Sequence, residues 1–145
     1  MVLAVDVEGD DYRFFKTLNE DVQLKPVSPT SKHYDIQMEN GDYANVTGKD
    51  SLYNAIVIAI LTRFNELSSI DLYEDFGCRA HELIKANVSS MVNYEIELFI
   101  VEALEKIRRI KKINSVELTE NEDNYIILFN VTSVNDQQIE GSVTV

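Results

Sequence analysis

The stretch TGKDSLYNAIVIAILTRFNEL (47–67) contains the longest uninterrupted apolar run of the chain, from Ala55 to Leu61, and it decides the fold. Its apolar residues fall on nearly every face of a helix, and the span is too long for one strand. A helix that is apolar all round has to be surrounded, so we expect the central core helix here, with Ile56, Ile60 and Phe64 as its spine. Asp50 or Ser51 can cap the first turn.

The residues before this helix divide into a hairpin and an arm. In DIQMENGDYANV (35–46), Asn40-Gly41 supplies the positive φ angles of a tight turn, which predicts a small hairpin. KPVSPTSKH (25–33) holds both prolines and no periodic apolar pattern, as is typical of an extended linker. We therefore expect an extended N-terminal arm over residues 1–34 and one domain over residues 35–145.

Two further helices are expected after the central one. CRAHELIKAN (78–87) follows Gly77 and predicts a short helix of about two turns. Ser89 or Ser90 then caps a long helix that runs to about Lys112, with an apolar stripe on one face. Acidic residues occupy its first turns and basic residues its end, which is the order that the helix dipole favours.

The rest of the chain alternates between apolar and polar residues with a period of two. The segments INSVEL (113–118), YIILFNVTSV (125–134) and QIEGSVTV (138–145) are separated by polar turns. This pattern predicts an antiparallel meander that covers one face of the long helix. The expected fold class is α+β, with helices packed on a small antiparallel sheet.

Composition excludes several classes of protein. The 145 residues carry 13 basic and 25 acidic side chains, a net charge of −12, so we expect no nucleic-acid partner. The single Cys78 allows no internal disulfide. The longest apolar run is far shorter than the roughly 20 residues of a membrane helix, and the acidic start is unlike a signal peptide. We expect a soluble protein made in a reducing compartment, with no membrane insertion.

The sequence contains no complete catalytic or metal-binding motif. His81-Glu82 begins a zinc-protease motif, but Lys85 stands where the second histidine ligand is required. Cys78 follows a glycine near a helix start, where a thiolate could be stabilised, although a buried structural cysteine is the favoured interpretation. Asp71, Glu74 and Asp75 could place two carboxylates across a cleft, but an acidic solvated loop explains them with no further assumption. We expect no enzyme activity and no cofactor.

Two surfaces are candidates for partner contacts. One is the basic end of the long helix, which either complements the helix dipole or docks an acidic neighbour. The other is the last strand, whose free amides and carbonyls at a sheet edge could pair with another chain. The basic candidates are Lys106, Arg108, Arg109, Lys111 and Lys112, and the strand candidates are Ile139, Ser142, Val143, Thr144 and Val145.

The order of these elements resembles the baseplate wedge family of contractile phage tails and injection systems, the gene product 25-like proteins once labelled lysozyme-like. The similarity spans about residues 35–134 and lies in an ordered series rather than in one motif. Its hairpin residues are Asp35, Gly41 and Asp42; its first-helix residues are Val46, Gly48, Leu52, Ala55, Ile56, Leu61, Thr62 and Glu66; the later ones are Phe76, Gly77, Leu83, Ile84, Ala103 and Leu104. The family's acid-Pro-Arg triplet after the long helix is absent, and Arg108-Arg109-Ile110-Lys111-Lys112 stands in its neighbourhood.

The resemblance implies a structural component of a phage or archaeal-virus tail baseplate, assembled in the host cytoplasm and present in multiple copies in a symmetric virion. It implies an inner wedge protein that joins the wedge to the tube and initiates the sheath, with wedge proteins, tail tube and tail sheath subunits as partners. Sheath arms would add strands beside the C-terminal sheet. The alternatives are a small muralytic hydrolase, as the old family label suggests, and an adaptor protein of a non-contractile tail.

Overall fold

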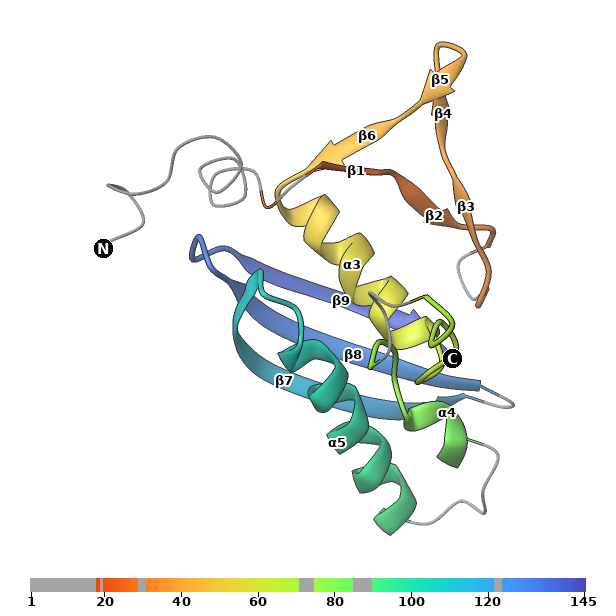
Figure 1. Ribbon diagram of the computed structural model, residues 1–145. Coiled ribbons are helices and arrows are strands. Elements are labelled where there is room, and N and C mark those ends of the chain that lie inside the picture. The colour runs from red at the N-terminus through yellow and green to blue at the C-terminus, as the bar shows by residue number, and fades with distance from the viewer. Residues whose placement is uncertain (1–17, 19, 29–30, 71–74, 85–89, 122–123) are drawn as a thin grey trace.

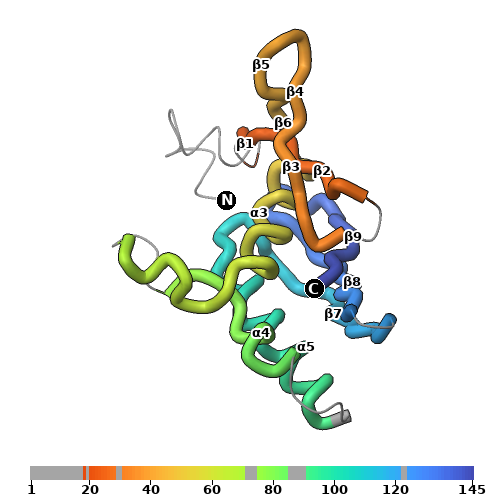
Figure 2. Tube along the Cα trace, turned by 90° about the vertical axis from the view of Figure 1, so that its right-hand side faces the viewer, coloured from red at the N-terminus to blue at the C-terminus, as the bar shows by residue number. Residues whose placement is uncertain are grey.

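The computed structural model describes residues 18, 20–28, 31–70, 75–84, 90–121 and 124–145 (Figure 1). A three-stranded antiparallel sheet forms the back of the molecule, and the helices α3 and α5 lie side by side on one of its faces (Figures 1 and 2). Six short strands, β1 to β6, precede α3 and stand to one side. The predicted α+β class, with helices on a small antiparallel sheet, is confirmed. None of the described helices is long and apolar enough to cross a membrane.

The sheet consists of β7 (Ile110–Asn121), β8 (Asn124–Ser133) and β9 (Gln138–Thr144), in that order. The three expected strands are therefore present, and β7 starts earlier than predicted. Alternate residues of the central strand β8 face the helices and are buried, because successive side chains of a strand point to opposite faces. These residues are Tyr125, Ile127, Phe129, Val131 and Ser133.

The central helix α3 (Lys49–Leu61) is shorter than predicted. Thr62 adopts an extended conformation, and the chain then turns back to the segment before α4: Cys78 N–H donates to Thr62 O, and Phe64 N–H donates to Cys78 O. The expected extension to Leu67 is therefore wrong, and Phe64 lies beyond the helix. The predicted side-chain cap is also wrong, because Gly48 occupies the cap position and Ser51 is buried inside the fold.

The remaining helices are α4 (Ala80–Leu83) and α5 (Ser90–Glu105). The expected continuation of α5 to about Lys112 is wrong. Turn hydrogen bonds from Ile107 N–H to Leu104 O and from Ile110 N–H to Ile107 O follow the helix, and Ile110 then pairs with Ser133 in the sheet. The apolar spacing of three between Ile107 and Ile110 fits a helix as well as this turn, so the pairing with β8 decides the conformation.

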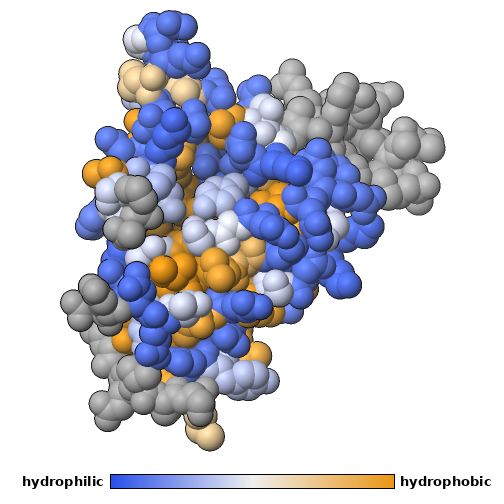
Figure 3. Space-filling view, turned by 180° about the vertical axis from the view of Figure 1, so that it is seen from behind, coloured by the Kyte–Doolittle hydropathy of each residue, from blue (hydrophilic) through white to orange (hydrophobic). Residues whose placement is uncertain are grey.

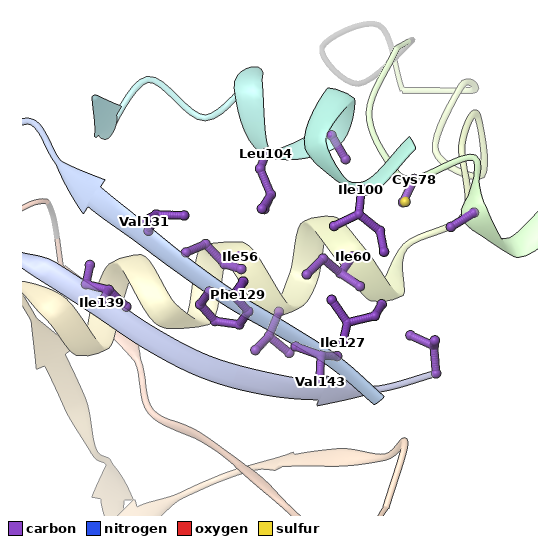
Figure 4. Close-up of a cluster of buried hydrophobic side chains, with 14 of the residues drawn as sticks. Ile56, Ile60, Cys78, Ile100, Leu104, Ile127, Phe129, Val131, Ile139 and Val143 are labelled. Atoms are coloured by element: carbon purple, nitrogen blue, oxygen red, sulfur yellow. The ribbon is translucent and has the colours of Figure 1, made fainter. Parts of the chain in front are cut away.

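The core lies between the two long helices and the sheet (Figure 4). Ile56 and Ile60 of α3 are at most 1% exposed, which confirms these two members of the predicted spine. Each such side chain contributes roughly 1.5–3 kcal/mol when it is fully buried. The partners that Figure 4 labels are Cys78, Ile100, Leu104, Ile127, Phe129, Val131, Ile139 and Val143.

The six short strands form three two-stranded ribbons: β1 (Glu20–Val22) with β6 (Asn45–Thr47), β2 (Leu24–Pro26) with β3 (Tyr34–Ile36), and β4 (Met38–Glu39) with β5 (Asp42–Tyr43). They meet at a cyclic set of backbone hydrogen bonds: Gln23 N–H to Ala44 O, Ala44 N–H to Gln37 O, and Gln37 N–H to Gln23 O. We call this unit the β-triangle. The ribbon of β4 and β5 projects away from the helices and the sheet (Figure 2).

The β-triangle confirms one prediction and corrects another. The predicted hairpin is present, with positive φ at both Asn40 (52°) and Gly41 (81°). The expected linker at 25–33 is in part a paired strand, because Lys25 and Pro26 belong to β2. Residues 1–17 of the expected arm lie outside the described part of the chain, and the domain boundary at residue 34 stays a prediction.

Candidate assembly surfaces

The five predicted basic residues lie in a turn and at the start of a strand, not at the end of a helix. Lys106, Arg108 and Arg109 follow α5, while Lys111 and Lys112 belong to β7. Lys106 directly follows the last residue of α5, so the dipole of that helix can account for Lys106 but not for the whole cluster. We call the range 106–112 the basic segment.

Arg109 is an internal anchor within this segment. Its Nη1 donates to the carbonyl of Leu18 at 2.8 Å and to Ser51 Oγ at 3.2 Å. Leu18 and Ser51 are fully buried, and Ser51 Oγ donates to the same Leu18 carbonyl. Burial lowers the pKa of the Arg109 guanidinium, while the nearby Asp21 carboxylate raises it. Arg109 thus joins the start of β7, the first turn of α3 and the segment before β1, and it is not a surface charge available for docking.

The other basic side chains are exposed. The Lys106 ammonium donates to the carbonyl of Asp75 at 2.8 Å and lies 5.1 Å from the centre of the Phe64 ring. Lys111 forms an ion pair with Asp136 at 2.6 Å. An ion pair this exposed contributes at most about 1 kcal/mol, so a partner could replace it. Lys112 pairs with Thr132 in the β7–β8 ladder, and its side chain makes no ion pair with the described residues. The exposed positive charge of the basic segment is therefore that of Lys106, Arg108, Lys111 and Lys112.

The second predicted surface, β9, forms an edge of the sheet. Tyr125 and Val145 exchange both backbone hydrogen bonds, and Ser133 N–H donates to Gln137 O. Such pairs alternate along an antiparallel ladder, so every second residue of β9 turns its backbone groups toward β8. The residues between them turn their N–H and C=O groups away from the sheet. These outward residues are Gln138, Glu140, Ser142 and Thr144.

This alternation divides the predicted strand contacts into two groups. Ser142 and Thr144 present backbone groups at the edge, as expected. The side chains of Ile139, Val143 and Val145 are at most 5% exposed and belong to the core, so they position the edge rather than contact a partner. Gln138 and Glu140 were missed, although the apolar/polar alternation of QIEGSVTV contains the signal that separates the two groups.

Tyr53 of α3 covers one point of this edge. Its hydroxyl donates to the outward carbonyl of Ser142 at 3.1 Å, and its ring packs beside Phe129 with the ring centres 5.7 Å apart. Burial raises the pKa of the Tyr53 hydroxyl, and the hydrogen bond to Ser142 partly offsets this effect. A Cβ on Gly141 would lie 2.2 Å from Cε2 of Tyr53, so only glycine fits under the ring. Tyr53 is 89 residues from Ser142 in the chain, and no local pattern predicts this contact.

The opposite edge, β7, carries several features that oppose strand addition. Its pairing with β8 shifts register twice, between Ile110 and Lys112 and between Ile113 and Ser115. Lys111 and Lys112 lie on the same strand, and the outward N–H of Leu118 donates to Glu97 Oε1 at 3.2 Å. Bulges, lysines and covered amides are the means by which proteins protect a sheet edge. β9, in contrast, pairs at seven consecutive positions without a register shift, and its sequence contains no Lys, Arg or Pro.

The residues considered for catalysis have structural surroundings. Cys78 is 1% exposed, and burial raises its pKa to about 11, so its thiol is protonated at neutral pH. His81 Nε2 lies 2.7 Å from the carbonyl of Ile60. Asp71 and Glu74 lie outside the described residues, and Asp75 is exposed. No group of three or more potential metal ligands occurs among the residues that the structure describes.

A hollow of about 470 Å³ lies between α5 and β7. Its acidic lining residues are Glu97 and Glu105. They are eight positions apart on one helix, which places their backbones roughly 12 Å apart. The Glu97 carboxylate also accepts a hydrogen bond from the Leu118 amide at 3.2 Å.

Comparison with known proteins yields a structural match. No protein-family model matches this chain, and no curated protein matches it significantly. Among solved structures, the chain is similar to a "putative tail lysozyme" from Geobacter sulfurreducens, with a TM-score of 0.56 and 20% sequence identity. The match covers 66% of this chain and 86% of that one. At this identity the likeness establishes a shared fold.

Proposed function

We propose that this chain is a structural component of a contractile-tail baseplate, where it joins the inner wedge to the tube and initiates the sheath. The fold is similar to that of a protein named a "tail lysozyme", and the order of elements in the sequence resembles the baseplate wedge family. The observation that carries the proposal is the regular edge of β9, where Tyr53 covers the carbonyl of Ser142, at the opposite side of the sheet from a β7 edge that is blocked. Such an asymmetric sheet accepts an added strand on one side only.

In this proposal the sheath contact is a strand of a sheath subunit that pairs with β9. The outward groups of Gln138, Glu140, Ser142 and Thr144 would supply the hydrogen bonds, while Ile139 and Val143 hold β9 on the core. The wedge contact would use the exposed cations of the basic segment. Their attraction to an acidic wedge protein is screened by salt over about 8 Å at physiological ionic strength.

Proline substitution at an outward amide tests the sheath contact without removing β9 from the core. Ser142→Pro removes an N–H that faces away from β8 and places the proline ring where an added strand would lie. Glu120→Pro on β7 is the matched control. Glu120 lies two residues after Leu118 on the same strand, so its amide faces outward as the amide of Leu118 does. Truncation of residues 137–145 is unsuitable, since it would remove the buried Ile139, Val143 and Val145.

The readout is the composition of particles purified from the parent virus or injection system. With Ser142→Pro we expect baseplates and tubes without sheath, and with Glu120→Pro we expect normal sheathed particles. Sheathed particles from Ser142→Pro would refute strand addition at β9. Replacing Arg108, Lys111 and Lys112 with Glu should reduce incorporation of the protein into the wedge, with the fold intact because Arg109 is retained.

The name of the structural neighbour favours a muralytic hydrolase as a second candidate. That function requires two carboxylates across a sugar-sized cleft, and Glu97 and Glu105 line the hollow beside α5. Peptidoglycan clearing by the purified protein tests it directly. Clearing that disappears in Glu97→Gln or Glu105→Gln would support the hydrolase, and the absence of clearing by the intact protein would remove it.

A further inference from the structure

A ladder of polar side chains crosses the face of the sheet that the helices leave open. Asn114 Nδ2 donates to Asn130 Oδ1 and to Thr132 Oγ1, both at 2.9 Å, and Asn130 Nδ2 donates to Glu140 Oε1 at 2.6 Å. The ladder thus runs from β7 through β8 to β9. Figure 3 shows this face from behind, with a small apolar area bordered by polar side chains.

The hydrogen bonds of the ladder all point in one direction, and its last member, Glu140, is an acceptor at the edge of the sheet. Each amide donates toward β9, so the series ends at the edge on a carboxylate, which is an acceptor. Glu140 is exposed, and Asn130 is its hydrogen-bond donor among the described residues. A side chain on a neighbouring strand, directly opposite Glu140, would lie about 4.5–5.5 Å away on the same face. Only a donor continues the ladder there, and a cation does so most strongly.

We infer that the strand added at β9 is one with a lysine or arginine opposite Glu140, and that this pair sets its register. This inference rests on the proposed function, because it assumes that a strand adds at β9. The net charge of −12 on the chain agrees with a basic partner segment. Register needs such a marker because the backbone groups along β9 repeat every two residues and cannot distinguish one alignment from the next.

Ser142 gives the partner strand a second requirement. Its outward carbonyl already accepts the Tyr53 hydroxyl, so an arriving strand has to share or replace that bond. The exchange leaves no buried group unsatisfied, because the carbonyl has two acceptor positions and the Tyr53 hydroxyl is close to solvent. Tyr53 therefore protects the edge in the free protein without closing it.

An appended strand provides the test in the full-length chain. A tight Asn-Gly turn is added beyond Val145, in the frame that gives Glu140, Ser142 and Thr144 hydrogen-bonded partners, followed by alternating Val and Thr. Two versions carry Lys or Glu opposite Glu140. We expect the Lys version to melt about 3 °C above the Glu version at low salt, with the difference shrinking in 1 M salt. In a Glu140→Lys background the order should reverse.

The control is Glu117→Lys, which changes an exposed acid on the same face of the sheet but on β7. It should leave the order of the two melting temperatures unchanged. Equal melting temperatures of the two versions, or a difference that Glu140→Lys does not reverse, would overturn the inference about the residue opposite Glu140. Amide protection of the appended strand would in that case still support strand addition at β9. Absence of amide protection in both versions would overturn strand addition at β9 as well.

Discussion

Gly141 offers the sharpest test of how β9 is held against the core. In Gly141→Ala, the new Cβ would lie 2.2 Å from Cε2 of Tyr53 and 2.8 Å from Cζ of Phe129. An ordinary contact is longer than 3.4 Å, so the Tyr53 ring has to retreat by about 1 Å. That movement breaks the hydrogen bond from the Tyr53 hydroxyl to Ser142 O.

The two effects give the magnitude. Overpacking of this kind costs about 1–3 kcal/mol, and the lost hydrogen bond adds about 0.5–1.5 kcal/mol. We therefore expect Gly141→Ala to lower the free energy of unfolding by about 2–4 kcal/mol. In a chain of this length that corresponds to a fall in Tm of roughly 8–15 °C. Urea unfolding followed by circular dichroism measures the free energy, and calorimetry measures Tm.

A double-mutant cycle assigns the loss to the Tyr53 ring. In a Tyr53→Ala background the space above Gly141 is open on that side, so Gly141→Ala should be at least 1 kcal/mol less destabilising there. Tyr53→Phe isolates the hydroxyl contribution. A Gly141→Ala protein within 0.5 kcal/mol of the parent, or an equal loss in both backgrounds, would show that the ring does not pack over Gly141.

Three further perturbations test other parts of the fold. Ile60→Asp places a carboxylate at a site that is 1% exposed and should destabilise the protein by about 4 kcal/mol or more, whereas Ile58→Asp, at a 39% exposed site on the same helix, should be much milder in the same urea titration. Arg109→Met removes the charged hydrogen bonds to Leu18 and Ser51 and should lower stability by about 1.5–3 kcal/mol, while Lys112→Met should change it by less than about 0.5 kcal/mol. Burial raises the pKa of Cys78 from 9.0 to about 11 in the native protein, so the free energy of unfolding should be independent of this thiol below pH 9. It should then fall by on the order of 2–3 kcal/mol as the pH rises from 9 to about 11. A pH series of unfolding measurements should show this fall in the parent and not in Cys78→Val.

Elements with a strong local period could be predicted from the sequence, and elements that depend on distant pairing could not. The three sheet strands and the Asn40-Gly41 hairpin follow from alternation and turn chemistry. The end of α5 does not, because Ile107 and Ile110 continue the helical spacing and only the pairing of Ile110 with Ser133 makes it a strand residue. The local sequence does not predict β1 either, since this strand depends on pairing with β6 and on a hydrogen bond from Asn54 Nδ2 to Val22 O.

The candidate surfaces divide in the same way. That β9 forms an edge follows from its place as the last strand of a meander, and its polar/apolar alternation identifies the outward residues. The internal role of Arg109 could not be predicted, because its partners Leu18 and Ser51 are 91 and 58 residues away. Composition suggested one basic patch, whereas tertiary contacts divide it into an anchor and exposed charges.

The cyclic junction of the β-triangle has a consequence for its dynamics. Its ribbons contain three, three and two residue pairs, and each is too short to be stable alone. Because the amides of Gln23, Gln37 and Ala44 each bind the next ribbon in the cycle, opening one ribbon removes a partner from another. The β-triangle should therefore open and close as one cooperative unit. These three amides should exchange with solvent deuterium at a common rate, which is faster than the exchange of the amides in α3 and in the sheet.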